Sequence, residues 1–383
     1  MNKLDYFTRL LPEIIKYKVF RRTGLMKINP FTLTFSVTAA CQSRCKTCKI
    51  GEMYHENPER KKKDLTVSEI ENVFKTMKPL YFFNVSGGEP FLRNDLPEII
   101  ELACRFLKPR IIHIPTNALM PKKILKATSD TLDIINKGYN DTILTVKPSI
   151  DGVGTLHDQI RGVKGNFKRL LETIELLKQL VIENDNFHLE LGTVVSNYNI
   201  DHLEEIEDFV HSLDVESYRN EIAEQRSEFF NVGDPITPNA EVYERMIKDF
   251  SQKIVSNIHK KKKLTKATEA LRLTYYQIAS RILKENRQVI PCYACISNVH
   301  INYDGGVWPC CVLGYEQEIG NLRNYNYNFQ QLWYSDEARK VRNYIKNKTC
   351  ACPLANQTYS NMLIDFNSML KIVYFTMLLS LKR

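Results

Sequence analysis

Three cysteines lie close together near the start of the chain, at Cys41, Cys45 and Cys48. Thiolates are soft ligands, and three of them on one short loop can hold three corners of a 4Fe–4S cluster. The fourth iron then keeps a coordination position for a small molecule, which favours catalysis over simple electron storage. A zinc site built from the same thiols is the alternative that the spacing leaves open.

Six more cysteines lie near the C-terminus, and Cys104 stands apart on a predicted amphipathic helix. The six are Cys292, Cys295, Cys310, Cys311, Cys350 and Cys352. The N-terminus lacks the apolar core and cleavage site of a signal peptide, so ten cysteines favour metal or redox chemistry over disulfides. We therefore expect a cytoplasmic protein with two metal-binding regions.

Composition and charge narrow the classes of protein. The chain has 383 residues, of which 43% are hydrophobic and 25% charged, which is ordinary for a globular protein and excludes collagen-like or wholly disordered chains. The net charge of +9 favours anionic partners such as phosphates, nucleic acid or an acidic membrane surface. The basic runs at 60–63 and 260–263 are interpreted as solvated helix faces or loops.

Apolar, β-branched segments alternate with helical patterns along the first two thirds of the chain. The expected strands are 31–37, 81–86, 110–115, 142–150, 188–195 and 216–223, and the expected helices between them are 67–77, 96–107, 122–136, 167–182 and 201–213. This alternation predicts an α/β fold with a parallel sheet and right-handed crossovers. Six such units form an open, partial (β/α)6 barrel, whose active site belongs at the carboxyl ends of the strands.

Polar motifs follow these predicted strand ends. Ser86-Gly87-Gly88-Glu89-Pro90 closes the second strand, where glycines permit a close approach of a ligand and the carboxylate can hold an amine. The third and fourth strands end at Thr116-Asn117 and at Ser149-Ile150-Asp151-Gly152. Each motif alone is as readily a turn or a cap, but together with the cysteine loop they follow the topology rule.

The cysteine spacing and these motifs together resemble the radical S-adenosylmethionine (SAM) superfamily. The resemblance implies that Cys41, Cys45 and Cys48 bind a 4Fe–4S cluster whose open iron takes the amino and carboxylate groups of SAM. One electron from the cluster then cleaves SAM, and the 5′-deoxyadenosyl radical takes hydrogen from a substrate. The cofactor-binding residues implied by the resemblance are Gly87, Gly88, Glu89, Pro90, Thr116, Asn117, Ser149, Asp151 and Arg161. Thr47 departs from the usual aromatic residue, and Ala118 stands in the place of a glycine.

The C-terminal cysteines resemble a SPASM domain, a small cysteine-rich module that binds auxiliary iron–sulfur clusters. Gly305 stands five residues before Cys310, in register with that family, and a hairpin is expected around Asp304-Gly305-Gly306. The resemblance implies one auxiliary Fe–S cluster. Its expected ligands are Cys292, Cys310, Cys350 and Cys352. Because only Ala351 separates the closing pair, Cys295 and Cys311 are alternative ligands, and zinc is an alternative metal.

The sixth predicted strand is unusually polar. Alternation places Tyr218, Asn220, Ile222 and Glu224 on one face and Arg219, Glu221 and Ala223 on the other. Two interpretations remain open for these polar groups: structural salt bridges, or substrate binding and proton transfer. The candidates for the second role are Tyr218, Glu221 and Glu224.

The expected organisation has five segments. These are an N-terminal amphipathic helix (1–29), the radical SAM core (30–230), a helical connector (231–290), the SPASM domain (291–355) with a helix at 329–344, and a C-terminal amphipathic helix (356–383). The apolar stretch at 369–381 is too short to span a bilayer. The terminal helices cover the barrel ends or, alternatively, form a platform for peripheral membrane contact or a lipid-linked substrate.

The function that the resemblance implies is that of a radical SAM enzyme of the oxidoreductase or maturase type. Its substrate is a peptide, a sugar or another small or lipid-linked molecule, and its electron donor a low-potential protein such as flavodoxin or ferredoxin. The auxiliary cluster accepts an electron or positions the substrate. The alternative is a zinc-stabilised, basic nucleic-acid-binding protein. That class explains the cysteines and the charge but not the strand-end motifs, and no aromatic-and-basic motif for base stacking is present, so we expect no nucleic acid partner.

Overall fold

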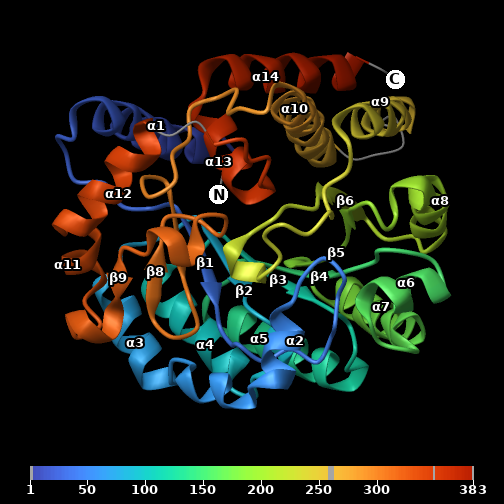
Figure 1. Cartoon of the computed structure of the whole chain (residues 1–383), viewed down its shortest axis with the longest axis horizontal. Coiled ribbons are helices and arrows are strands. Elements are labelled where there is room, and N and C mark those ends of the chain that lie inside the picture. Colours follow the sequence, from blue (N-terminus) through green and yellow to red (C-terminus); the bar gives the residue numbers. More distant parts are fainter. Residues whose placement is uncertain (1–2, 258–262, 348–349, 382–383) are drawn as a thin grey trace. The chain divides into compact units, whose positions relative to one another are not determined.

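The computed structural model describes residues 3–257, 263–347 and 350–381 (Figure 1). The chain forms two compact units. The sheet unit consists of Pro30–Thr237 and Asn298–Val341, and the helical unit consists of Met1–Asn29, Pro238–Ser297 and Arg342–Arg383. Each unit therefore combines segments that are far apart in the sequence.

The sheet unit is built on a nine-stranded sheet with the order β6-β5-β4-β3-β2-β1-β7-β8-β9. The strands are β1 (Thr32–Ser36), β2 (Phe82–Ser86), β3 (Ile111–Thr116), β4 (Ile143–Pro148), β5 (Phe187–Val195), β6 (Ser217–Ile222), β7 (Asn298–Ile301), β8 (Gly306–Trp308) and β9 (Gly320–Asn321). Neighbouring strands from β6 to β7 pair in parallel, as the βαβ pattern predicted. The expected mixed α/β fold with a parallel sheet is confirmed.

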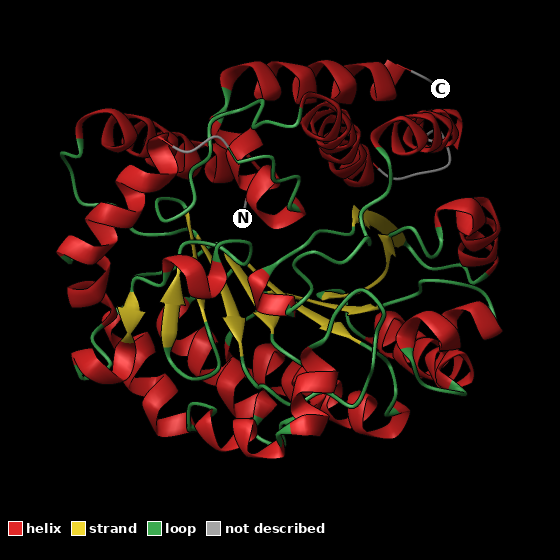
Figure 2. Cartoon of the chain, viewed as in Figure 1, coloured by secondary structure: helices red, strands yellow, loops and turns green. Residues whose placement is uncertain are grey.

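Helices cover one face of this sheet (Figures 1 and 2). They are α3 (Val67–Thr76), α4 (Leu96–Leu102, continued by a π-turn at Ala103–Leu107), α5 (Pro121–Gly138), α6 (Thr155–Arg161), α7 (Asn166–Glu183) and α8 (Leu203–Ser212). The short helix α2 (Ile50–Glu56) instead follows the cysteine loop, and its first residue, Ile50, lines a pocket described below. Phe74 of α3 packs edge-on against Phe35 of β1 and Phe83 of β2, with ring centroids 6.0 and 5.9 Å apart. Because strand side chains alternate, the residues between these aromatics point to the opposite, inner face of the sheet.

The inner face is mostly polar. Thr34, Asn84, His113 and Thr145 lie in register across β1 to β4, and β7 adds His300 beside Thr34. The buried outer face is apolar, and Leu33, Phe83, Ile112 and Leu144 are fully buried there. The sequence therefore folds with its apolar residues against the helices and its polar residues inside the partial barrel.

The hairpin of the cysteine-rich region joins the same sheet. β7 pairs in parallel with β1, and β8 and β9 follow in antiparallel order. The single helix expected at 329–344 is instead two helices, α11 (Phe329–Trp333) and α12 (Asp336–Asn347). The break occurs because the Ser335 hydroxyl accepts a hydrogen bond from the Ala338 backbone N–H (3.2 Å), which starts a new helix.

The helical unit contains α1 (Lys3–Thr23), α9 (Ala240–Asn257), α10 (Lys263–Glu285), α13 (Ala355–Ile364) and α14 (Phe366–Leu381). One helix was expected at the C-terminus, but the axes of α13 and α14 differ by 94°. Asp365 separates them and accepts a hydrogen bond from the Ser368 N–H (2.9 Å), as a helix-starting residue does. Among the described residues, no single helix is long and apolar enough to cross a membrane; only the bent pair α13–α14 has the length and composition for it.

Candidate functional site

The cysteine loop, residues 41–48, follows β1 and is held on two sides by backbone hydrogen bonds. The N–H groups of Arg44 and Lys46 donate to the carbonyls of Arg161 (3.1 Å) and Ile160 (2.9 Å) at the end of α6. On the other side, the Asn231 amide donates to the Thr47 carbonyl (2.7 Å). The loop is therefore fixed by segments more than a hundred residues away.

Two glycines make these close contacts feasible. A Cβ atom on Gly88 would lie 2.1 Å from the Ala40 carbonyl oxygen, and one on Gly162 would lie 2.1 Å from the Arg44 carbonyl oxygen. Such distances are far inside van der Waals contact, so only glycine fits. The Gly-Gly motif after β2 thus supports the start of the cysteine loop directly.

The three thiols lie close enough to influence one another. Burial, followed by the neighbouring Cys45 and Glu89, raises the pKa of Cys41 to about 12. Burial and the other two thiols also raise the pKa of Cys48 well above its usual value. Because a bound metal displaces thiol protons, three such neighbouring, partly buried thiols suit a metal site rather than a free nucleophile.

Arg161 connects the cysteine loop to the fourth and fifth strands. Its Nη1 donates to Cys45 Sγ (3.5 Å), and its Nε lies 3.0 Å from Asp151 Oδ2. Asp151 in turn accepts a hydrogen bond from the Val194 N–H (2.9 Å), and its charge helps to raise the pKa of Arg161 despite burial. Arg161 and Asp151, two of the residues that the resemblance assigns to the cofactor, therefore lie side by side, and their role in binding SAM stays a prediction.

Several buried polar groups around the cysteine loop remain without hydrogen-bond partners. Among the described residues, these include Arg161 Nη2, the Gln42 side-chain amide and the Ser43 hydroxyl. Unpaired buried polar groups are costly, so they indicate a missing partner. Three thiols and these donors fit an iron–sulfur cluster with a polar ligand such as SAM.

Glu89 connects the ends of β2 and β3. Its carboxylate accepts hydrogen bonds from the Asn117 N–H (2.7 Å), the Thr116 hydroxyl (2.9 Å) and the Phe91 N–H (3.2 Å). Burial raises its pKa to about 7, and these donors oppose that rise. Glu89 thus positions the Thr116-Asn117 turn, in which Asn117 Nδ2 lies 4.0 Å from Cys41 Sγ.

The other predicted cofactor residues take their places around this turn. Pro90 is buried and opens a short 3-10 helix, and the Ser149 N–H donates to the Thr116 carbonyl (3.0 Å). Ala118 has φ +60°, a left-handed conformation that favours glycine, which explains why the related motif carries glycine there. Ala118 is fully buried, so the conformation is enforced by its surroundings.

Charged groups on the inner face of β4 to β6 form a paired network. Lys147 Nζ lies 3.0 Å from Glu221, and Arg219 lies 3.0 Å from Glu190. Burial raises the pKa of Glu221, but Lys147 and Arg219 outweigh it and lower that pKa to about 2. These contacts support the salt-bridge interpretation of Glu221.

The other two candidates from the sixth strand lie elsewhere. Tyr218 is on the opposite face from Glu221 and shares a hydrogen bond with the Thr193 hydroxyl (2.8 Å). Glu224 lies beyond the end of β6 and pairs with Arg226 (3.2 Å). The structure therefore does not bring the three candidates together, and their catalytic role stays a prediction.

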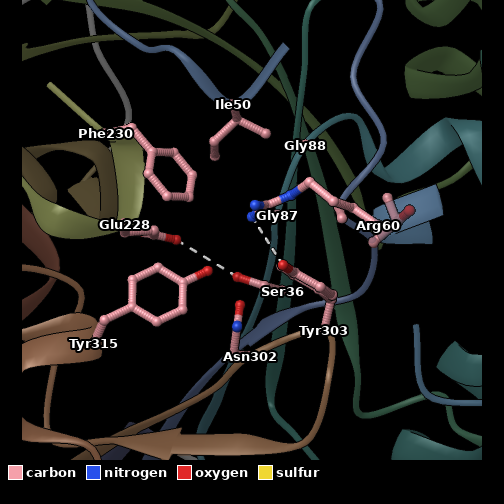
Figure 3. A pocket seen from close by; sticks show the side chains of 12 residues that line it. Ser36, Ile50, Arg60, Gly87, Gly88, Glu228, Phe230, Asn302, Tyr303 and Tyr315 are labelled. Carbon is pink, nitrogen blue, oxygen red and sulfur yellow. Dashed lines mark hydrogen bonds between the residues drawn. The ribbon is translucent and has the colours of Figure 1, made fainter. Parts of the chain in front are cut away.

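A pocket that the sequence did not reveal lies beside the Gly-Gly motif (Figure 3). Arg60 belongs to the basic run that we expected to be solvated, but it is half-buried. Its guanidinium lies 5.0 Å from the ring centroid of Phe230 and 5.8 Å from that of Tyr303, and it donates to the Tyr303 hydroxyl (2.9 Å). No carboxylate within the described ranges lies at ion-pair distance from it. The second basic run, at 260–263, lies mostly outside the described residues.

The pocket is lined by residues from both the core and the hairpin region. They are Ser36, Thr38, Ala39, Ile50, Arg60, Gly87, Gly88, Glu228, Phe230, Asn302, Tyr303 and Tyr315. Phe230 has φ +54°, an unfavourable conformation for a bulky residue. Strain of this kind is common at functional sites. No sequence motif marks the aromatic and polar residues of this pocket, because they come from separate segments before, within and after the hairpin.

A buried Glu228–His300–Cys311 cluster adjoins this pocket. His300 Nδ1 lies 3.1 Å from Cys311 Sγ, and His300 Nε2 lies 2.8 Å from the Ser36 hydroxyl. The potential ligand atoms of the three residues lie within 4.8 Å of one another. Burial raises the pKa of Glu228 to about 7, whereas burial and Arg226 lower that of His300 to about 3. Burial therefore favours the neutral form of each of these three groups.

The remaining C-terminal cysteines are divided between the two units. Cys310 follows β8 in the sheet unit, whereas Cys292, Cys350 and Cys352 belong to the helical unit. Burial raises the pKa of Cys292 to about 11, and the Cys350 thiol of the same unit contributes to that rise. The alternative Cys295 is fully buried beside Arg342, and its carbonyl accepts a hydrogen bond from that residue (2.8 Å). The ligand set stays a prediction.

Comparison with known proteins finds two domain families in this chain. Residues 35–210 match the radical SAM superfamily, and residues 289–353 match an iron–sulfur cluster-binding domain, SPASM. The AdoMet-dependent heme synthase of Oleidesulfovibrio alaskensis is 26% identical over 80% of this chain and 74% of its own length. The mycofactocin maturase of Mycolicibacterium smegmatis is 25% identical over 46% of this chain and 40% of its own length.

Solved structures share the fold. Native anSMEcpe with bound AdoMet and a Cp18Cys peptide has a TM-score of 0.58 at 16% identity, covering 91% of this chain and 97% of that one. Streptococcus suis SuiB bound to its precursor peptide SuiA has a TM-score of 0.58 at 15% identity, covering 91% and 73%. None of these findings supports the nucleic-acid alternative. The chain belongs to the radical SAM superfamily, with a SPASM domain, and is an enzyme whose cofactors are a 4Fe–4S cluster, SAM and auxiliary iron–sulfur clusters.

Proposed function

We propose that this enzyme reductively cleaves SAM and abstracts a hydrogen atom from a carboxylate-bearing substrate, of which a peptide is the first candidate. The observation that carries the proposal is the fixed trio of Cys41, Cys45 and Cys48 beside the unpaired donor of Arg161. When bound, the cluster supplies the electron that cleaves SAM, and the resulting 5′-deoxyadenosyl radical takes hydrogen from the substrate.

The chain's own residues then hold and orient the cofactors. The cysteine loop supplies the cluster ligands, and the Gly87-Gly88 backbone lies against its first residues, where no side chain fits. Arg161, which burial and Asp151 keep in place, offers a guanidinium N–H to a carboxylate or ribose oxygen. Glu89 and Asn117 keep the third strand end beside Cys41.

The Arg60 pocket supports a carboxylate-bearing substrate. A half-buried guanidinium between two aromatic rings, without a carboxylate partner in the described structure, fits an incoming anion. The hydroxyls of Tyr303 and Tyr315 and the amide of Asn302 lie in the same pocket and can complete the hydrogen bonds. Its position beside Gly87 and Gly88 places such a substrate next to the SAM-binding motif.

Two substrate classes have support from relatives. The mycofactocin maturase and the Bacillus subtilis sporulation killing factor maturation protein favour a peptide. The two AdoMet-dependent heme synthases favour a tetrapyrrole, and one of these matches spans 80% of the chain. Both classes can carry carboxylates, so the Arg60 pocket is compatible with either.

The SPASM domain and an electron donor complete the proposal. We assign one auxiliary cluster to Cys292, Cys310, Cys350 and Cys352, where it accepts an electron from the substrate or positions it. A low-potential donor such as flavodoxin or ferredoxin supplies the first electron. Reconstituted protein should then contain about eight iron atoms per chain, from two four-iron clusters.

The test is anaerobic incubation of the reconstituted, dithionite-reduced protein with SAM, with 5′-deoxyadenosine measured by chromatography. Peptide and tetrapyrrole candidates are then added separately, and the Arg60→Gln variant is compared with Lys62→Gln, which changes an exposed neighbour on the same 3-10 helix. We expect uncoupled cleavage to survive in both variants and substrate-stimulated turnover to fall only in Arg60→Gln. No 5′-deoxyadenosine from fully iron-loaded protein would refute the proposed activity, and unchanged KM in Arg60→Gln would refute the carboxylate subsite.

A further inference from the structure

The positive charge of the chain is concentrated at its two ends. Residues 1–29 and 366–383 contain ten lysines and arginines and two acidic residues, a net charge of +8, whereas the whole chain has a net charge of +9. The remaining residues therefore contribute only +1. A chain whose excess charge lies in two short segments presents those segments to an anionic partner.

The last helix of these segments, α14, exposes large apolar side chains along one face. They follow helical spacing and are Phe366 (66% exposed), Leu370 (53%), Val373 (44%), Tyr374 (61%) and Met377 (61%). The opposite face is buried: Ile372 is 8% exposed and Leu379 fully buried. A helix that is apolar all round is normally buried, so the exposed apolar face of α14 indicates that a binding partner covers it.

The first helix, α1, has the same character and belongs to the same helical unit (Figure 1). Leu11 (59% exposed), Ile15 (55%) and Val19 (37%) lie at intervals of four residues and so share one face. Arg22 is exposed in the last turn of α1, and Leu25 and Met26 are exposed just beyond it, whereas the neighbouring Arg21 donates to the Cys292 carbonyl (3.1 Å). Exposed apolar residues and basic residues thus occur together in both terminal helices.

We propose that α1 and α14 bind an anionic lipid surface and so attach the enzyme to the face of a membrane. Apolar side chains enter the boundary between headgroups and acyl chains, and lysine and arginine side chains contact the lipid phosphates. Tyr374 suits this boundary, and the Lys371 side chain, also exposed on α14, can reach the headgroups. With 16 residues, α14 is shorter than a bilayer core and lies along the surface instead of spanning it.

A second copy of the chain is the competing occupant, and the charge distribution argues against it. In a dimer formed through these helices, each copy would contribute segments with a net charge of +8 to the interface. Asp5 and Glu13 are the only acidic residues in these segments. Like charges of that size oppose self-association, whereas an anionic bilayer neutralises them. Lipid is therefore the occupant that satisfies both the apolar and the charged groups.

The test is co-sedimentation of the full, reconstituted enzyme with vesicles of phosphatidylcholine alone and of equal parts phosphatidylcholine and phosphatidylglycerol. The double variant Leu370→Glu/Met377→Glu places carboxylates on the exposed face of α14. The matched control is Ile182→Glu, which changes a residue of α7 that is 86% exposed and lies in the sheet unit. Iron content and circular dichroism should be unchanged in both, because all three side chains are exposed.

We expect the wild type and Ile182→Glu to sediment with anionic vesicles, less with neutral ones, and less again at high salt. The α14 variant should lose binding by about tenfold or more, because buried apolar area and attraction to anionic lipid fall together. The proposal is overturned if the wild type ignores anionic vesicles. It is equally overturned if the wild type is a dimer that the α14 variant converts to a monomer without any change in vesicle binding. SAM cleavage is independent of either outcome, so the proposed activity is tested separately.

Discussion

Two polar regions of the sheet unit differ in how their charges are satisfied. On the inner face of β4 to β6, each charged side chain has an opposite partner, as in Lys147 with Glu221 and Arg219 with Glu190. Around the cysteine loop, Arg161 also has an opposite partner in Asp151, but its Nη2 stays buried without a hydrogen bond, and the three thiols lie beside it.

The difference separates structural charges from ligand-binding ones. When a buried charge loses its partner, the folded protein is destabilised, so the effect of the loss is measured as a change in stability. An unpaired buried donor is tolerable only where a ligand supplies the missing partner. Removing such a donor should therefore weaken ligand binding and catalysis. Variants in the two regions should therefore affect different measurements.

The largest effect is expected from Cys41→Ser. The substitution removes a cluster ligand, so 5′-deoxyadenosine formation should be abolished and about four iron atoms per chain should be lost. Cys104→Ser is the control, because Cys104 is a buried thiol that lies on the outer helical layer. Full activity in Cys41→Ser would mean that the ligands are elsewhere, and the contrast between the regions would fail.

A smaller but still large effect is expected from Gly88→Ala. The added Cβ would lie 2.1 Å from the Ala40 carbonyl oxygen and displace the cysteine loop, whereas Gly138→Ala meets nothing within 4 Å. Because a displacement of about 1 Å can cost about a hundredfold in rate, SAM cleavage should fall by that order in Gly88→Ala. Gly138→Ala should match the wild type. Equal rates in the two variants would show that the Gly-Gly turn does not position the loop.

The paired network should respond through stability. Lys147→Met leaves the partly buried carboxylate of Glu221 without its ion-pair partner and should destabilise the fold by about 2 kcal/mol. Adding Glu221→Gln should recover much of that loss, because the orphaned charge is removed. Thermal unfolding of the two variants measures this coupling, and Lys126→Met, from an exposed pair, should cost about 0.5 kcal/mol or less. If instead Lys147→Met stays stable but fails to turn over substrate, this network belongs to the substrate site.

The smallest effect concerns a paired carboxylate far from the cysteine loop. Glu69 accepts hydrogen bonds from Arg323 (2.9 Å), Tyr327 (2.7 Å) and the Thr66 N–H (2.8 Å), and these outweigh burial and lower its pKa to about 2 from 4.5. A lowered pKa gives stability above about pH 4.5 that is lost as the pH falls toward about 2. The difference in melting temperature between the wild type and Glu69→Gln should therefore shrink on acidification. A constant difference from pH 7 to 3 would exclude this linkage, and Glu71→Gln on the same helix serves as control.

Much of the sheet unit could be predicted from the periodicity of apolar residues alone. Each of the six predicted parallel strands lies within two residues of its place in the structure, because apolar and β-branched runs between helical patterns have few other uses. The helix breaks at Ser335 and Asp365 were missed. Both are short side chains that start a new helix by accepting backbone hydrogen bonds, and such local caps do not alter the apolar pattern.

The candidate site could be predicted in part from the sequence. The cysteine spacing and the strand-end motifs marked the residues that the structure gathers around Arg161, because parallel strands end at one edge. Arg60 was misjudged as solvated, since a run of four basic residues carries no sign that one of them turns between Phe230 and Tyr303. The hydrogen-bonded Glu228, His300 and Cys311 come from three separate segments, and no spacing rule connects them.

The sequence by itself determined the chemistry: which thiols could hold a cluster, which strand ends could hold SAM, and that the positive charge is concentrated at the chain ends. Only the tertiary structure decided which charges are paired, which donors remain unsatisfied and which apolar helix faces are open. The physical reason is that residue types and short periods are local properties. Pairing and burial, by contrast, depend on which distant segments the folded chain brings into contact, as Asn231 with Thr47 and Arg44 with Arg161 show.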